Sequence, residues 1–460
     1  MKRTYLYTII TAASATLMLQ GCQLGRHYVR PDLNLPARID TLNQDSSSIA
    51  DVPWQEVYQD STLQQMIEKT LNNNKDLRIA AAKVKELAEL KRIDFAGLFP
   101  KVGVNTYMEK EGFDEGGEKY SNSNKFYMKA SVTWELDLWG NLRWAKDKSM
   151  AEFLGSIENQ RAIQMSMIAQ MAQSYFELVA LDNELAIVRK TAEARRKGLH
   201  LAKIRYTGGL TNETPYRQAQ VELARTMTLI PDLEKKVAMK QNEIAFIMGE
   251  YPHDIERSVL PSDVTLPSTL PVGLPSSLLE RRPDVRKAEQ DLVAANAAVG
   301  MAFTNLFPRL SLTASGGSES KELENMLKSP YHIISGSLVN PVFNMGKNRA
   351  QLKAKKAAYE QALLSYEKTV LNAFKEASNA IIEFNKSRDI HKTRLHLERA
   401  SRSSLDLAKL QYINGVIGYL DLLDAQRSYL DAQIGLSNSI RDKQIAIVRL
   451  YKALGGGWKA

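Results

Sequence analysis

The chain has 460 residues, of which 44% are apolar and 25% charged, and this balance excludes a disordered protein. The formal net charge of +9 falls to +7 without residues 1–21, which carry two basic residues and no acid. Because Lys and Arg alternate with Asp and Glu along the predicted helices, this mild excess indicates solvated faces, and we expect no nucleic-acid partner.

The N-terminus has the pattern of a secretory signal. Lys2 and Arg3 precede an apolar run from Tyr5 to Leu19, which is too short for a stable transmembrane helix. We therefore predict a signal peptide over residues 1–21. No later apolar stretch approaches the length of about 20 residues that a membrane helix needs, so a membrane crossing would use strands.

Cys22 is the one cysteine of the chain, and it ends the string Leu19-Gln20-Gly21-Cys22, which resembles a bacterial lipobox. A lone thiol in an exported protein cannot form an internal disulfide. We expect Cys22 to carry a covalent lipid, with no other cofactor, and residues 22–56 to form an extended lipidated segment.

The second half of the sequence repeats the first, with four matches in the same order. Lys75–Arg78 corresponds to Pro283–Arg286 and Phe95–Pro100 to Phe303–Pro308, both at an offset of 208. Gly140 and Arg143 correspond to Gly346 and Arg349, and Leu199–Tyr206 to Leu405–Tyr412, at an offset of 206. We predict a tandem duplication, with one repeat over 57–250, a Pro-rich linker over 251–275 and a second repeat over 276–460.

Each repeat contains one very long predicted helix. No Gly or Pro occurs from Lys347 to Asn414, which corresponds to a helix on the order of 100 Å. Apolar and small residues recur in alternating steps of three and four, a coiled-coil-like seam. The seam consists of Leu363, Tyr366, Val370, Ala373, Ala377, Ile381 and Phe384 in the second repeat, and of Ile168, Met171, Tyr175, Leu178, Leu185 and Val188 in the first. Because a bundle of helices of this length is a rod or tube, we do not expect a compact core.

Each long helix reaches a Gly-containing turn, at residues 206–213 in the first repeat and 412–418 in the second. Glycine can end a helix in the left-handed conformation. A returning helix should then begin near Thr214-Pro215 in one repeat and run from Gly418 to Leu454 in the other. These turns are predicted to be the tips of two helical hairpins.

Two alternating segments precede the long helix of each repeat. The four predicted strands cover 101–112 and 125–138, joined by a Gly-rich polar loop, and 309–318 and 333–343. The period of two suits membrane strands, with Trp134 and Trp139 at the membrane interface, although soluble hairpins alternate in the same way. Since four strands cannot close a barrel, three chains would supply twelve strands around a lumen.

Several strings in this order closely resemble the TolC-like outer-membrane efflux factors, and in particular the lipoprotein branch that serves resistance-nodulation-division (RND) pumps. The strings are Tyr28–Pro31, Leu278–Arg286, Asn305–Pro308, Leu420–Arg427 and Leu450–Trp458. The resemblance implies an α+β membrane protein of tandem repeats: a homotrimer with a twelve-stranded β-barrel in outer-membrane lipid and a long periplasmic α-helical barrel. It also implies a periplasmic adaptor (membrane fusion) protein and an inner-membrane transporter as partners.

Nothing in the sequence indicates catalysis. The six histidines include no pair at i and i+4, and neither a nucleophile elbow nor a phosphate-binding loop occurs. We therefore expect no enzyme activity and no metal site, and interpret the protein as a passive exit duct for small toxic compounds such as drugs or metal ions.

Asp421 and Asp424 lie three residues apart, on one face of the helix that follows the second tip. Isolated acids are usually solvated, but the resemblance implies that these two face the tunnel axis, where a trimer would make rings of carboxylates. They are our candidates for a gate, with Tyr412 bracing the closed state. A well-known relative has a basic residue at Ile417 and an acid at Pro215, so the sequence leaves open how the closed state is locked here.

The tip residues Gly208, Gly209, Leu210, Gly415 and Val416 are candidates for docking the adaptor, although a turn alone requires such residues. Two alternatives remain open at this point. A type I secretion duct for proteins shares the fold, and a coiled-coil lipoprotein without a pore would explain Cys22 and the long helices but not the strands.

Overall fold

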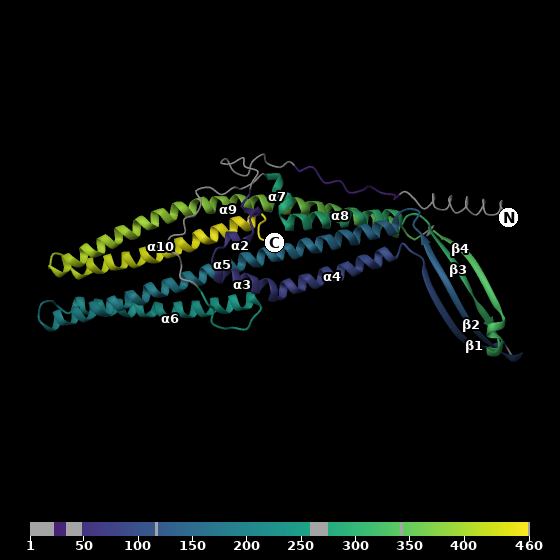
Figure 1. Ribbon diagram of the computed structural model, residues 1–460, viewed down its shortest axis with the longest axis horizontal. Helices are drawn as coiled ribbons and strands as arrows, with labels where there is room; N and C mark the ends of the chain where they lie inside the picture. Colours follow the sequence, from purple (N-terminus) through teal and green to yellow (C-terminus); the bar gives the residue numbers. More distant parts are fainter. Residues whose placement is uncertain (1–22, 34–47, 116–117, 258–274, 341–343, 459–460) are drawn as a thin grey trace. The chain divides into compact units, whose positions relative to one another are not determined.

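The computed structural model describes residues 23–33, 48–115, 118–257, 275–340 and 344–458 (Figure 1). The predicted signal peptide, Cys22 and most of the predicted linker lie outside these residues. The helices are α2 (Trp54–Val57), α3 (Ser61–Asn73), α4 (Lys75–Ala96), α5 (Asn141–Thr207), α6 (Thr214–Met248), α7 (Pro275–Arg281), α8 (Pro283–Thr304), α9 (Lys347–Ile413) and α10 (Tyr419–Ala453), with short 3-10 helices at η1 (Ile49–Asp51) and η2 (Leu323–Lys328).

The chain divides into two compact units, and each takes segments from both predicted repeats. The sheet unit contains the described residues up to Leu33 together with Lys83–Ile157 and Lys287–Lys368. The helical unit contains those of Asn34–Ala82, Glu158–Arg286 and Thr369–Ala460. Across the described part of the chain, no helix is both long and apolar enough to span a bilayer.

The sheet unit holds the four predicted strands, paired antiparallel in the order β1-β2-β3-β4. They are β1 (Lys101–Glu115), β2 (Glu118–Leu136), β3 (Arg309–Ser320) and β4 (Pro330–Val339), and they lie side by side in Figure 1. The prediction of a Gly-rich loop between β1 and β2 is wrong. Both strands continue through most of that stretch, and Gly112 pairs with Asn122. Polarity suggested a loop, but a hairpin ladder depends on backbone pairing and continues through polar residues.

The register brings the apolar residues of neighbouring strands onto one face. Val102 lies opposite Val132, Val104 opposite Ala130 and Met108 opposite Phe126. This face is largely exposed within one chain: Val102 is 74% exposed and Met108 73%. Outward-facing apolar side chains at alternate positions are typical of strands that contact lipid.

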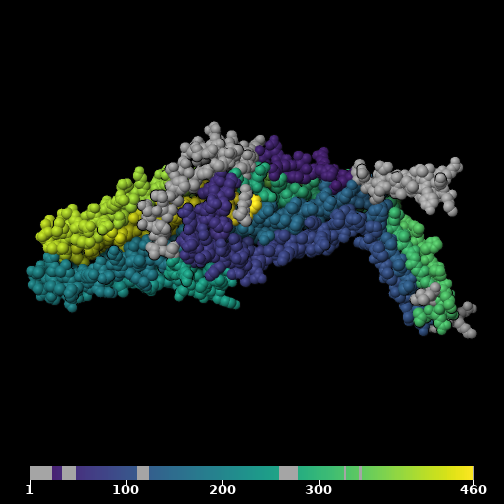
Figure 2. Space-filling model, viewed as in Figure 1, coloured from purple at the N-terminus to yellow at the C-terminus, as the bar shows by residue number. Residues whose placement is uncertain are grey.

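Residues 23–33 form an extended segment, here called the N-terminal strap, which lies along the helices of the sheet unit (Figure 2). The Leu24 N–H donates to the Trp139 carbonyl at 3.0 Å, and the Trp144 indole donates to the Leu24 carbonyl at 2.8 Å. Farther along, the Arg30 guanidinium makes two bonds to the carboxylate of Glu289 on α8, at 2.7 and 2.5 Å. The strap is therefore fixed at both of its ends.

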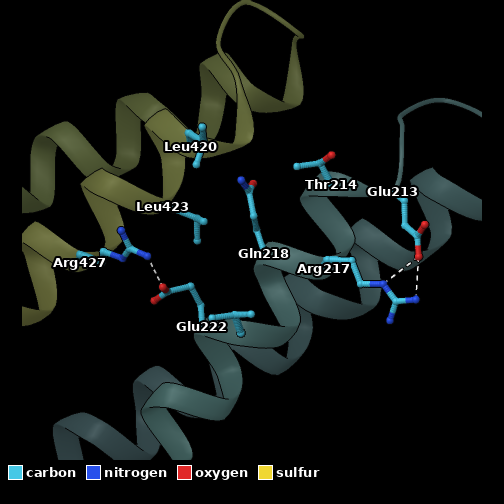
Figure 3. Close-up of a pocket in the computed structure, with 9 residues that line it drawn as sticks. Glu213, Thr214, Arg217, Gln218, Glu222, Leu420, Leu423 and Arg427 are labelled. Atoms are coloured by element: carbon cyan, nitrogen blue, oxygen red, sulfur yellow. Dashed lines mark hydrogen bonds and ion pairs between the residues drawn. The ribbon is translucent and has the colours of Figure 1, made fainter.

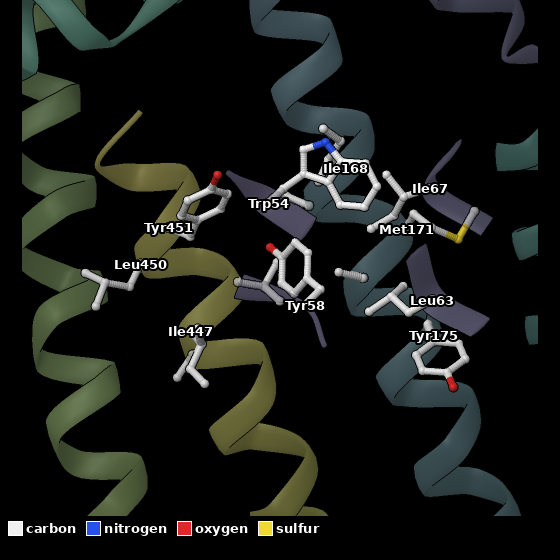
Figure 4. Packing of buried hydrophobic residues seen from close by; sticks show 14 of the residues in the cluster. Trp54, Tyr58, Leu63, Ile67, Ile168, Met171, Tyr175, Ile447, Leu450 and Tyr451 are labelled. Atoms are coloured by element: carbon white, nitrogen blue, oxygen red, sulfur yellow. The ribbon is translucent and has the colours of Figure 1, made fainter. Parts of the chain in front are cut away.

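The helical unit has a core that joins α2, α3, α5, α6, α9 and α10 (Figure 4). The predicted seams are buried except at Leu363, which is half-buried. Met171, Tyr175 and Leu178 on α5 and Ala373 on α9 are at most 1% exposed, as is Tyr366 in the part of α9 that belongs to the sheet unit. Both long helices have 67 residues, as the Gly- and Pro-free stretch of the second repeat predicts. Burial of one stripe along a helix of low overall hydropathy is what makes such a length stable.

The Arg-Arg-Pro-Asp string that opens the second repeat has a structural role. The guanidinium of Arg282 is buried, pairs with Asp284 at 2.6 Å and with Glu376 at 2.7 Å, and donates to the Ala453 carbonyl at the end of α10. The indole of Trp458 donates to the Arg281 carbonyl. This string therefore fastens the C-terminus to the start of the second repeat.

Candidate functional site: the hairpin tips

Both hairpin tips end their first helix in the same way. At the first tip, the Leu210 and Gly209 N–H groups donate to the carbonyls of Arg205 and Tyr206, at 2.9 and 3.0 Å. At the second, Val416 and Gly415 donate to Gln411 and Tyr412. This is a Schellman motif, which needs a left-handed residue, and Gly209 and Gly415 have φ of 74° and 73°.

The tips present small and apolar surface to solvent. Nothing lies within 4 Å of a Cβ built on Gly209 or Gly415, so both turns have open space around them. Leu210 and Val416 occupy the position that commonly packs back on the helix, yet they are 73% and 69% exposed. The tips therefore offer two exposed apolar side chains, each beside a glycine.

Tyr412, predicted to brace a closed state, is buried among the side chains of the second hairpin. It packs with Leu405, Ala408 and Leu422, and its ring lies 5.5 Å from that of Tyr419. The guanidinium of Arg205, from the first hairpin, lies over the Tyr412 ring at 5.0 Å. Tyr412 therefore contacts both hairpins.

The two candidate gate acids differ in their local roles. Asp421 caps α10, because its carboxylate accepts the Gly418 N–H at 3.0 Å. Asp424 is exposed and lies one turn before Arg427. Both remain predictions as gate residues, since one chain alone cannot form a ring.

Three side chains that the sequence did not single out form an ion-pair network near the tips. Glu222 of α6 is 2% exposed and pairs with Arg427 of α10 and, at 3.1 Å, with Arg195 of α5. Arg195 is itself buried and donates to the Glu222 carbonyl and to Thr226 Oγ1. The network joins the first hairpin to the second (Figure 3). Its sequence signal is weak: a Glu and an Arg on amphipathic helices look like any solvated pair.

The charges of this network keep it ionised. The Arg427 hydrogen bond, together with the positive charges of Arg195 and Arg225, holds the pKa of Glu222 below its ordinary value of 4.5. Burial lowers the pKa of Arg195, but a guanidinium stays protonated in proteins. Burial also raises the pKa of the nearby Tyr419 to about 12, so its phenol is neutral at physiological pH.

A cavity of about 490 Å³ opens between the starts of α6 and α10. Figure 3 shows Leu420 and Leu423 on one side and Gln218, Arg217 and Glu213 on the other, with the Glu222–Arg427 pair alongside. Arg217 is held by Glu213 at 2.7 Å. Within the described residues, no cluster of three His, Cys, Asp or Glu side chains could hold a metal ion.

The remaining predicted residues lie elsewhere. Trp134 donates to the Leu98 carbonyl at 3.0 Å, and Trp139 donates to Pro308 at 2.7 Å while stacking on Phe307. Both indoles therefore lie where strands meet helices in the sheet unit. Cys22 immediately precedes the described strap.

The family model for outer membrane efflux proteins matches residues 66–250 and again 274–456. The chain belongs to this family. The efflux protein is 31% identical to the solvent efflux pump outer membrane protein SrpC of Pseudomonas putida, over 96% of this chain and 97% of SrpC. It is 28% identical to the cation efflux system protein CusC of Escherichia coli O6:H1, over 96% and 97% of the two chains.

Solved structures of this efflux protein's relatives share its fold. The outer-membrane channel OprN superposes with a TM-score of 0.89 at 30% identity, over 95% of this chain and all of that one. The open state of the MtrE outer membrane channel of Neisseria gonorrhoeae gives 0.87 at 27% identity, over 95% and 99%. The protein is therefore an outer-membrane channel component of an efflux system, with the predicted fold class, location and family confirmed.

Proposed function

We propose that three copies of this chain assemble into a passive exit duct, anchored by a lipid on Cys22, with no catalytic chemistry of its own. The main support for the trimer comes from the sheet. Within the described chain, β1 and β4 each pair with a strand on one side only, and the apolar face of the sheet is exposed. Unpaired strand edges in a membrane must find partners, and neighbouring copies supply them. The probable outer membrane lipoprotein SilC of Salmonella typhimurium, 27% identical over 98% of both chains, supports the lipid anchor.

The hairpin tips are the proposed docking site for the periplasmic partners. Exposed Leu210 and Val416, beside glycines that allow close approach, suit docking of an adaptor protein, which would connect the duct to an RND-type transporter. The relatives include pumps named for cations, solvents, toluene and antibiotics. The cargo class is accordingly small toxic compounds, drugs or metal ions, chosen by the transporter.

Asp421 and Asp424 would form two carboxylate rings at the narrow entrance, attracting cations and holding the resting duct closed. The test is the conductance of the purified trimer in planar bilayers. We expect the double variant Asp421→Ala with Asp424→Ala to leak more and to prefer cations less.

The matched control removes two exposed acids farther along the same helix, Asp431→Ala with Asp442→Ala, and should leave both properties unchanged. Equal conductance and selectivity in the Asp421/Asp424 variant and the wild type would reject the gate. Failure of both the wild type and the Asp421/Asp424 variant to conduct would reject the duct.

A further inference from the structure

The first turns of α9 carry an unusual concentration of positive charge. Five basic side chains occur within ten residues, with no acid until Glu360, and all five are exposed: Lys347, Arg349, Lys353, Lys355 and Lys356. None of them forms an ion pair with an acid in the described part of the chain. Uncompensated cations that are this dense repel one another, so an anionic partner would stabilise them.

The matching turns of the first repeat show that this charge is not a requirement of the fold. At the offset of 206, the counterparts of Lys347, Lys353, Lys355 and Lys356 are Asn141, Asp147, Ser149 and Met150. Arg143, the counterpart of Arg349, is half-buried and paired with Asp137 at 3.1 Å, and Lys148 is paired with Glu152. The same structural position is therefore neutralised in one repeat and strongly basic in the other.

Helical spacing gathers part of this charge onto one side. Arg349, Lys353 and Lys356 follow one another at i, i+4 and i+7, which places them on one face of α9. From Lys347 to Lys356 the helix rises roughly 14 Å. The headgroup layer of a bilayer is several Å thick, and its charge is felt over a Debye length of about 8–10 Å beyond it. All five basic side chains therefore fit within reach of the headgroup charge.

Contacts within the sheet unit place the start of α9 close to the first residue of the N-terminal strap. Gln23, the residue after Cys22, donates to Asp147 in the first turns of α5. The amide of Asn141 in α5 donates to Asn305 Oδ1 at 3.2 Å, and the amide of Asn348 in α9 donates to the carbonyl of the same Asn305 at 3.1 Å. The first turns of α5 and α9 therefore both contact Asn305, and α5 also contacts the first residue of the strap.

Exposed apolar surface adjoins these cations along the chain. On β4, Ile334 and Leu338 are 85% and 67% exposed, and Met345, two residues before Lys347, is 85% exposed. A lipid-facing strand that is followed along the chain by a basic helical turn has the order of a membrane boundary: hydrocarbon first, then phosphate.

We propose that the basic start of α9 binds anionic phospholipid headgroups on the periplasmic side of the outer membrane, and this rests on the proposed outer-membrane duct. Phosphatidylglycerol is the expected ligand class, because its phosphate carries a net charge that zwitterionic phosphatidylethanolamine lacks. The lipid on Cys22 would supply the hydrocarbon anchor and α9 the headgroup contact. The starts of the two long helices thereby divide their roles, because α5 contacts the first residues of the strap and α9 binds lipid.

The test uses the full-length trimer in nanodiscs of phosphatidylethanolamine with a minority of phosphatidylglycerol, and quantifies the retained phosphatidylglycerol by mass spectrometry. The wild type should prefer phosphatidylglycerol. One Lys or Arg near an anionic surface strengthens binding about fivefold. The variant Arg349→Gln, Lys353→Gln, Lys356→Gln should therefore lower the affinity by at least about fivefold, and added salt should weaken the wild-type preference.

The control removes three exposed cations from another part of α9, Lys392→Gln, Arg399→Gln and Arg402→Gln, and should bind as the wild type does. Unchanged phosphatidylglycerol binding in the Arg349/Lys353/Lys356 variant would overturn the lipid site. If that variant changed ion selectivity and not lipid binding, the three basic side chains would lie in the lumen and the lipid site would again be overturned. If the Asp421/Asp424 variant conducts and the wild type shows no lipid preference, the lipid site alone is rejected. If neither the wild type nor that variant conducts, the duct is rejected.

Discussion

The two hairpin tips have the same backbone and different surroundings. Both use a glycine with φ near 74° and the same two hydrogen bonds. At the second tip, however, Tyr412 is buried beneath Ile417 and Tyr419, whereas at the first tip Tyr206 is 38% exposed and stacks on Tyr216 with centroids 6.0 Å apart.

This difference shows what the duplicated halves share and where they diverged. The turn that ends each long helix is common to both, because its geometry depends on one glycine and two carbonyls. The side chains that hold the hairpins together are not common to both: Glu222 and Arg195 belong to the first hairpin and Arg427 to the second. The inter-hairpin link therefore depends on the asymmetry between the repeats.

The largest effect is expected from Glu222→Ala. This change leaves the buried Arg195 without its carboxylate, and breaking a buried pair costs roughly 3–5 kcal/mol. Thermal unfolding of the trimer should shift down, and hydrogen exchange should accelerate along α6 and α10. The channel should also leak, because Arg427 loses its partner across the hairpins.

Glu213→Ala is the matched control, since it removes a surface partner of Arg217 on the same helix and should cost under about 1 kcal/mol. If the two variants were equally stable, the network near the tips would have no structural role.

A smaller effect is expected at the turns themselves. Gly415→Val and Gly209→Val place a β-branched residue in left-handed backbone, which costs on the order of 1–2 kcal/mol, and add bulk where the adaptor would dock. Efflux in cells should be abolished while the trimers remain in the membrane, as a gel of unheated samples would show.

The comparison variant is Gly198→Ala, inside α5 with open space around it, which should stabilise the helix by up to about 1 kcal/mol and leave efflux intact. Normal efflux in either valine variant would reject the docking role of that tip.

The smallest effect is expected from pH. Because the folded-state pKa of Glu222 lies below 4.5, its contribution to stability is complete above that pH and is lost only as the pH falls through the lowered value. The difference in melting temperature between the wild type and Glu222→Ala should stay constant from about pH 8 to pH 5. In stronger acid the two melting temperatures should converge. Convergence near neutral pH would mean that the carboxylate is not held by the arginines.

Much of the architecture could be predicted from the sequence because its signals are long and periodic. The Gly- and Pro-free stretch from Lys347 to Asn414 predicted one long helix, and α9 ends one residue earlier, at Ile413. Thr214-Pro215 marked the start of α6. The segments with a period of two predicted all four strands, including the one that contains Trp134. The polar stretch from 113 to 124 misled the prediction, because a hairpin ladder gives no signal when neither of its faces is apolar.

The candidate site was less predictable for a physical reason. Asp421 and Asp424 drew attention through the family resemblance, and their role as rings needs three chains. The Glu222 network depends on residues 27 and 205 positions apart along the chain, which only packing brings together. Burial distinguishes such a pair from a solvated one, and burial cannot be read from charge type or helical spacing alone.

The N-terminal strap has a consequence for the order of folding. Its partners lie far away in sequence: Trp144 is 120 residues from Leu24, and Glu289 is 259 residues from Arg30. Contacts that close such long loops form after local helices and hairpins, because the chain entropy lost on closure must be offset by structure already present. With the predicted signal peptide removed, the strap would be the first segment to be exported and yet among the last to reach its native position.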